Sequence, residues 1–235
     1  MSKHAITNKD RIEKNRKTII ELMHFSCKTI DGIHMLRHEV ADVEPMILVK
    51  SQMTNDSRNN RASFIEWANL TNISNAYKFI LENKHTRINW VEINKLHNIL
   101  IENTEVQSGF RNCMAMVLGQ IAPSANKIYH KMDEIEYRLH NQNTSVLTRA
   151  FDTHFEIIAT QPFNDYNKRT ARLVMNWFLI QHNYTPIIFT KKTDSVDYNA
   201  ALHQRIDGNR RAYTEYMETS MLHTQKQIIK LLNYR

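Results

Sequence analysis

Residues 161–172 read QPFNDYNKRTAR and lead directly into the apolar run LVMNWFLI at 173–180. The first segment carries one carboxylate, two Asn and three cationic side chains. Burying such groups costs free energy unless they find partners. The second segment is apolar almost throughout, as in a helix with protein on every side. The stretch therefore predicts a polar loop that opens a buried helix over residues 167–182.

A loop of this kind can hold an anion. Helix N-termini present unpaired N–H groups and the positive end of the helix dipole. Arg169 and Arg172 are three residues apart and share a helical face, which suits two-point contact with a polyphosphate. Asp165 could hold a divalent metal ion bound to the same phosphates. The same residues are also consistent with a solvated first turn whose arginines face water.

The rest of the chain predicts helix after helix. Only 4 Gly and 4 Pro occur in 235 residues, which argues against sheet-rich folds with frequent tight turns. The fold class is therefore expected to be all-α. Helical periodicity marks these segments: 10–24, 63–83, 89–101, 124–142, 144–159, 167–182, 195–206 and 210–234. Ser63 with Glu66 forms a candidate capping box, and Asn89 is a candidate N-cap.

Two regions interrupt the helical pattern. Residues 44–61 contain Pro45 and an Asn-rich tract, which indicates a loop between N-terminal helices (1–60) and a main body (61–235). Residues 104–123 hold Gly109 and Gly119 around a short β-capable stretch. This second region predicts a small β-hairpin, or flap, on the helical body.

Bulk properties narrow the function class. The net charge of +7 suits an acidic partner, but the basic residues are spread along the chain, so nucleic-acid binding is the weaker interpretation. Cys27 and Cys113 give neither metal spacing nor a disulfide framework. The N-terminus is polar and no run is long enough for a membrane span. We expect a cytoplasmic protein, with secretion without a cleaved signal left open.

The segment 161–172 resembles the signature of the Fic/Doc family, His-Pro-Phe-x-Asp/Glu-Gly-Asn-Gly/Lys-Arg-x-x-Arg. The helix before it, with His154 and Phe155, and the run RLVMNWFLIQHNYTPI after it are similar to the family's surrounding helices. The stretch GFRN at 109–112 resembles the segment that precedes the family's β-hairpin. The resemblance covers roughly residues 20 to 225.

This resemblance implies an all-α Fic-type domain that binds ATP, usually with Mg²⁺, and transfers AMP to a hydroxyl of a target protein. Asp165 takes the metal role and Asn167 the anion-hole role. Lys168, Arg169 and Arg172 are assigned to nucleotide binding. Pro162 and Phe163 would hold the loop and the core. A target protein or other partner would bind at the flap near Gly109–Gly119.

The sequence departs from the family at the position of the general base, where it has Gln161. A carboxamide takes up no proton near neutral pH, so Gln161 cannot deprotonate a hydroxyl. General-base catalysis typically contributes about 10²- to 10⁴-fold, so a loss of that order is expected. His154 lies seven residues earlier, about 10 Å along a continuous helix, and is expected to be a packed helix histidine rather than a substitute base.

Both glycines that flank the motif Asn in many family members are replaced. Tyr166 occupies the first position and restricts a backbone that Gly leaves free. Lys168 occupies the second and resembles the Doc branch, in which the nucleotide sits differently and a phosphoryl group is transferred. Doc-like proteins also use the His that Gln161 replaces, so Gln161 argues against phosphoryl transfer as much as against AMP transfer.

Residues 27–32, CKTIDG, resemble a second feature of the family. In many Fic proteins an inhibitory helix carries a Glu that pairs with the second motif Arg. Asp31 stands in that place here, with Arg172 as the expected partner, and is one methylene shorter. The alternative is a helix C-terminus closed by Gly32.

The favoured interpretation is a nucleotide-binding Fic-domain protein with weak or no transferase activity. One alternative is an active AMP transferase, or a Doc-like phosphotransferase, that uses an unusual base. Another is a basic, helical nucleic-acid-binding module.

Overall fold

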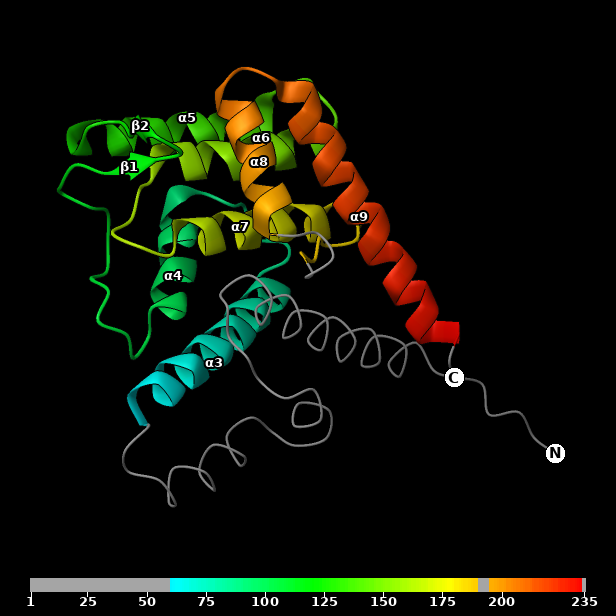
Figure 1. The fold of residues 1–235 in the computed structure, drawn as a ribbon, viewed down its shortest axis with the longest axis horizontal. Helices are drawn as coiled ribbons and strands as arrows, with labels where there is room; N and C mark the ends of the chain where they lie inside the picture. The colour runs from blue at the N-terminus through cyan, green and yellow to red at the C-terminus, as the bar shows by residue number, and fades with distance from the viewer. Residues whose placement is uncertain (1–59, 190–194, 234–235) are drawn as a thin grey trace.

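The apolar run predicted to form a buried helix lies in α7 (Asn167–Gln181), at the centre of the molecule. The computed structural model describes residues 60–189 and 195–233 (Figure 1). Ten residues of α7 are buried, and Trp177 is completely enclosed. A helix buried over most of its surface is stabilised chiefly by packing rather than by local propensity.

The other described helices pack on α7 or on its neighbour along the chain, α6. These are α3 (Asn60–Glu82), α4 (Trp90–Leu100), α5 (Ile128–Asn141), α6 (Val146–Thr160), α8 (Ser195–Ile206) and α9 (Arg210–Asn233). The loop 161–166 joins α6 to α7, and the two helices pack along much of their length. In Figure 1, α8 and α9 form a helical hairpin at one side of the bundle. The prediction of an all-α fold is confirmed.

Asn176 links α7 to two other parts of the core. Its side chain donates to the Tyr77 hydroxyl at 2.9 Å and to the Ile187 carbonyl at 3.0 Å, and accepts from the Ile187 N–H at 2.8 Å. Three hydrogen bonds compensate the cost of burying this amide. The segment after α7 is thereby fixed to the helix.

The expected flap is present as a short antiparallel hairpin. Strand β1 (Met116–Val117) pairs with β2 (Gln120–Ile121) across Leu118 and Gly119, whose φ values are 49° and 79°. Positive φ at both central residues is the requirement of a type I′ turn, and Gly meets it without strain.

The structure corrects one helix start and confirms another. Helix α3 begins at Asn60, so Ser63 lies inside the helix and the capping-box prediction is wrong. Arg61 and Ala62 are good helix formers, which allows the helix to extend past Ser63. Asn89 does cap α4, accepting the Glu92 N–H at 2.9 Å. Asp31 and the rest of 1–59 lie outside the described residues.

His97 attaches the loop 161–166 to α4. Its ring stacks on Phe163 with centroids 3.7 Å apart, and its Nε2–H donates to the Asp165 carbonyl at 3.1 Å. Phe163 also forms an isolated antiparallel bridge with Phe110. Burial of the imidazole lowers the pKa of His97 to about 4, so the ring is neutral at pH 7.

No helix in the described part of the chain is both long and apolar enough to cross a membrane.

The buried His97 makes stability depend on pH. Its folded-state pKa of about 4 lies below the ordinary 6.5, so the unfolded chain binds more protons between these values and stability falls as pH falls through that window. Between pH 7 and pH 5, we expect the free energy of unfolding to fall by about 2 kcal/mol less in the His97→Gln variant than in the wild type. Urea unfolding at both pH values measures this difference.

The matched control is His85→Gln, which removes an exposed imidazole from the turn after α3. This variant should keep the fall in stability between pH 7 and pH 5 that the wild type shows. Equal pH dependence of the wild type and His97→Gln would show that His97 does not titrate in this window.

Candidate functional site

The backbone of the loop 161–166 is left-handed at both ends. Gln161, the C-cap of α6, has φ 46° and ψ 60°, and Tyr166, the N-cap of α7, has φ 61° and ψ 13°. For residues other than Gly this conformation costs roughly 1–2 kcal/mol. Tyr166 therefore occupies a position where Gly would be unstrained, whereas Lys168 lies in regular helix and needs no such freedom.

Asn167 closes the loop with its side chain. Its Oδ1 accepts the Phe163 N–H at 2.9 Å, and its Nδ2 donates to the Phe163 carbonyl at 2.9 Å and to Gln161 Oε1 at 3.0 Å. The residue is buried, and these bonds occupy both ends of its amide. Its contribution to an anion site is therefore through the backbone N–H at the start of α7.

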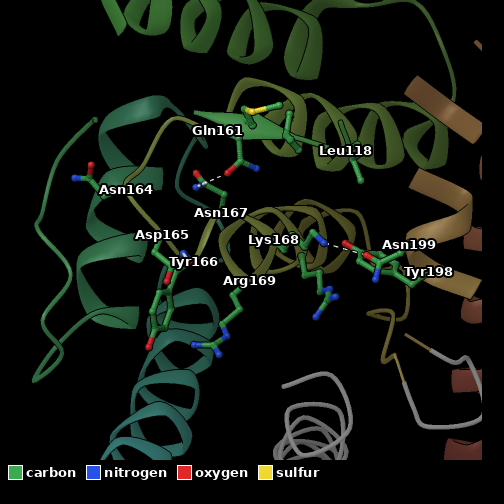
Figure 2. A pocket seen from close by; sticks show the side chains of 13 residues that line it. Leu118, Gln161, Asn164, Asp165, Tyr166, Asn167, Lys168, Arg169, Tyr198 and Asn199 are labelled. Carbon is green, nitrogen blue, oxygen red and sulfur yellow. Dashed lines mark hydrogen bonds between the residues drawn. The ribbon is translucent and has the colours of Figure 1, made fainter. Parts of the chain in front are cut away.

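The Gln161 amide is bonded within the protein. Its Oε1 accepts from Asn167 (Figure 2), and its Nε2 donates to the Ile158 carbonyl at 2.8 Å. The side chain thus bridges the end of α6 and the start of α7. An amide in this arrangement is a structural link and supplies no site for proton uptake.

Arg111 joins the base of the flap to the end of α6. Its guanidinium donates to the carbonyls of Gln161 at 2.6 Å and Thr160 at 3.3 Å, and also to those of Cys113 and Pro123, on either side of the hairpin. The side chain is buried among these carbonyl oxygens, and those of Thr160 and Gln161 lie at the negative end of the α6 dipole. The flap and the loop are therefore held together by one cation.

A cavity of about 470 Å³ lies beside the loop, between the flap and α8. This volume is within the ordinary range for small-molecule sites. It is lined by residues 116–118 of the flap, Gln161 and 164–166 of the loop, Asn167, Lys168, Arg169 and Arg172 of α7, and Tyr198 and Asn199 of α8 (Figure 2). Three of the lining side chains are cationic and one, Asp165, is anionic.

The start of α7 lies in this cavity. Thr170 is the first residue whose N–H donates to a carbonyl within the helix, at Tyr166, and no side chain caps the helix N-terminus. The N–H groups of residues 167–169 therefore have no acceptor inside the helix. With the positive dipole end and the nearby cations, they form an environment that favours an anion.

The cations of α7 have different partners. The Arg169 guanidinium lies 4.1 Å from the ring centroid of Tyr166. Lys168 donates to Asn199 Oδ1 at 2.9 Å, and Arg172 lies 4.4 Å from the ring centroid of Tyr198. Burial, and then the charge of Arg172, lower the pKa of Lys168.

Asp165 is exposed at the edge of the cavity, where its Oδ1 accepts the Tyr166 N–H at 2.6 Å. The described residues contain no cluster of three or more His, Cys, Asp or Glu side chains that could hold a metal ion by themselves. One carboxylate suits Mg²⁺ when phosphate oxygens and water complete its coordination shell. The residues present therefore fit a metal ion that arrives with a phosphate ligand.

His154 is a packed histidine, as expected. It is completely buried in α6, with Nδ1 2.7 Å from the Tyr213 hydroxyl and Nε2 2.9 Å from the Tyr198 hydroxyl. Both ring nitrogens are thus occupied, and His154 does not line the cavity. It therefore has no ring nitrogen free to accept a proton in the cavity.

Sequence reasoning missed four residues that shape the site. Arg111 lies in the stretch GFRN, and its one signal in the sequence is the place of a lone Arg before a predicted hairpin. His97 carried no signal beyond a histidine in an apolar helix. Tyr198 and Asn199 carried none, because their place at the cavity depends on how α8 packs.

Comparison with known proteins gives a family match for part of the chain. Residues 88–179 match the sequence model of the Fic/DOC family. The protein adenylyltransferase fic-1 of Caenorhabditis elegans is 26% identical over 143 residues, which is 59% of this chain and 28% of that protein. The protein adenylyltransferase Fic of Drosophila melanogaster is 30% identical over 113 residues, or 46% and 23% of the two chains. The chain thus spans about a quarter of the length of these relatives.

Solved structures share the fold. Fic-1 from C. elegans superposes with a TM-score of 0.77 at 18% identity, over 99% of this chain and 69% of that one. A Fic domain containing signaling protein from Bacteroides thetaiotaomicron gives 0.70 at 16% identity, over 97% and 91%. The match to the Fic/DOC family thus runs from the segment before α4 into the last turn of α7, and the fold around it is that of solved Fic proteins.

Proposed function

We propose that this protein binds ATP, with Mg²⁺, in the cavity at the start of α7, and that it has weak or no AMP-transferase activity. The observation that carries the proposal is the combination of an anion-favouring helix N-terminus with a carboxamide at the position of the base. Its protein adenylyltransferase relatives support the nucleotide as the ligand class.

The cavity supports a polyphosphate ligand. The N–H groups at the start of α7 and the side chains of Lys168, Arg169 and Arg172 all belong to its lining. Charge-assisted hydrogen bonds from such groups to phosphate are stronger than bonds between neutral groups. Asp165 would hold the Mg²⁺ ion, which shields phosphate charge.

The position of Gln161 supports impaired transfer. Acceptance of a proton from a target hydroxyl needs a basic atom within hydrogen-bond reach, and the Gln161 amide has none. The flap still offers a place for a target, with Met116 64% exposed and Ile121 70% exposed on its two strands. Binding of nucleotide and partner can thus persist without turnover. We propose a cytoplasmic location, in which ATP and Mg²⁺ are available.

Removal of one motif arginine should weaken nucleotide binding. We expect Arg169→Ala to raise the Kd for Mg-ATP about 10- to 100-fold, because a charge-assisted hydrogen bond is worth roughly 1.5–3 kcal/mol. Isothermal titration measures the change. Arg211→Ala is the control, since Arg211 is exposed on α9 and pairs with Glu215. Absence of heat in both the wild type and the variants would contradict nucleotide binding.

Restoring the base should restore transfer. We expect the wild-type protein to leave lysate proteins unlabelled by α-labelled ATP and Gln161→His to label them, with a gain of about 10²- to 10⁴-fold. Gln161→Asn is the matched control, because Asn tolerates the left-handed backbone but takes up no proton.

Parallel incubation with γ-labelled ATP separates the alternatives. Transfer of γ label would indicate phosphoryl transfer of the Doc-like kind. Labelling by the unmodified protein with either nucleotide would refute impaired activity. If Gln161→His also fails to label lysate proteins, Tyr166 and Lys168 would be the residues that prevent transfer.

A further inference from the structure

Lys168 and Arg172 lie one turn apart on the face of α7 that meets α8. Consecutive residues of α8 contact them. Lys168 Nζ donates to Asn199 Oδ1 at 2.9 Å (Figure 2). The Arg172 guanidinium lies 4.4 Å from the Tyr198 ring centroid. All four side chains belong to the cavity lining. Helix α8 therefore forms a wall of the cavity at the point where two of its cations project.

The contacts that hold these cations are neutral. Within residues 60–189 and 195–233, no carboxylate pairs with Lys168 or Arg172, and Arg172 Nε is buried without a hydrogen-bond acceptor. Like charges at this helical spacing repel one another. Rings and an amide can fix the two cations without neutralising them, so both charges remain available to an anion.

Tyr198 is held in place by hydrogen bonds of its hydroxyl group in the protein core. Its hydroxyl donates to His154 Nε2 at 2.9 Å, His154 Nδ1–H donates to the Tyr213 hydroxyl at 2.7 Å, and Tyr213 donates to the Phe151 carbonyl at 2.9 Å. This chain needs a neutral imidazole, and burial lowers the pKa of His154 well below its ordinary value, with further lowering by Arg172 and Lys168. The Phe189 ring packs against Tyr198 and also lies 5.0 Å from the Arg172 guanidinium.

We infer that Tyr198 and Asn199 are positioning residues, which hold Arg172 and Lys168 in the cavity so that both cations can contact the phosphates of the ligand. The inference rests on the proposed nucleotide site and extends it to α8. In this inference His154 holds Tyr198 in place and takes no part in proton transfer.

The test is a pair of double-mutant cycles, which isolate the coupling between two residues. Affinity for Mg-ATP is measured by isothermal titration for Tyr198→Leu, Arg172→Met and the double variant, and for Asn199→Ala, Lys168→Met and their double variant. We expect Tyr198→Leu to weaken binding about tenfold and Asn199→Ala about threefold in the wild-type background. Tyr198→Leu should not weaken Mg-ATP binding further in the Arg172→Met background. Asn199→Ala should not weaken it further in the Lys168→Met background.

Adenosine, followed by ligand-observed NMR, reports on damage to the cavity itself. Positioning of phosphate-binding cations predicts that Tyr198→Leu and Asn199→Ala weaken the binding of Mg-ATP more than the binding of adenosine. Tyr137→Leu, on an exposed tyrosine of α5, is the control for loss of a tyrosine. If Tyr198→Leu does not fold, the cycle through the partly exposed Asn199 decides the question.

The inference would be overturned if the loss of Mg-ATP affinity were the same with and without the partner cation, or the same for ATP and adenosine. Either result would leave the proposed nucleotide site standing. Failure of the wild-type protein to bind Mg-ATP would overturn the proposed function and this inference with it.

Discussion

The structure depends on one connection, the six-residue loop between α6 and α7. Helix α7 is buried on nearly every side, yet its N-terminus opens into a cavity, so the preceding chain must turn sharply and stay in place. Left-handed backbone at Gln161 and Tyr166 makes the turn, and the Asn167 side chain closes it. The strain at two non-glycine residues is offset by hydrogen bonds and by the stack of His97 on Phe163.

The electrostatics of the site follow from this arrangement. The cations around the cavity are held largely by carbonyl groups, an amide and aromatic rings: Arg111 by carbonyls, Lys168 by Asn199 and Arg172 by Tyr198 and Phe189. The two buried histidines nearby are neutral because burial lowers their pKa values. Within the described residues no carboxylate pairs with Arg111, Lys168 or Arg172, so these three charges favour an anionic ligand.

The departures from the family motif differ in physical kind. Lys168 replaces Gly at a helical position, so it adds a charge at no conformational cost. Tyr166 takes on a left-handed backbone and stacks on Arg169, which links strain in the loop to the position of a motif cation. Gln161 links α6 to α7 through an amide that has no basic atom. The proposed function therefore combines an intact loop scaffold with the lack of a proton acceptor at residue 161.

The sequence by itself determined the helical class, the hairpin at Gly119, the buried α7 and the motif residues at its start, because these follow from local periodicity, turn chemistry and a contiguous signature. It misplaced the start of α3, where helix-forming residues extend the helix past Ser63. Only the tertiary structure decided that Arg111 grips the end of α6, that His97 supports Asp165 and that Tyr198 and Asn199 face the motif cations. These contacts join residues from 26 to 68 positions apart, and their geometry depends on how whole helices pack, which local pattern does not encode.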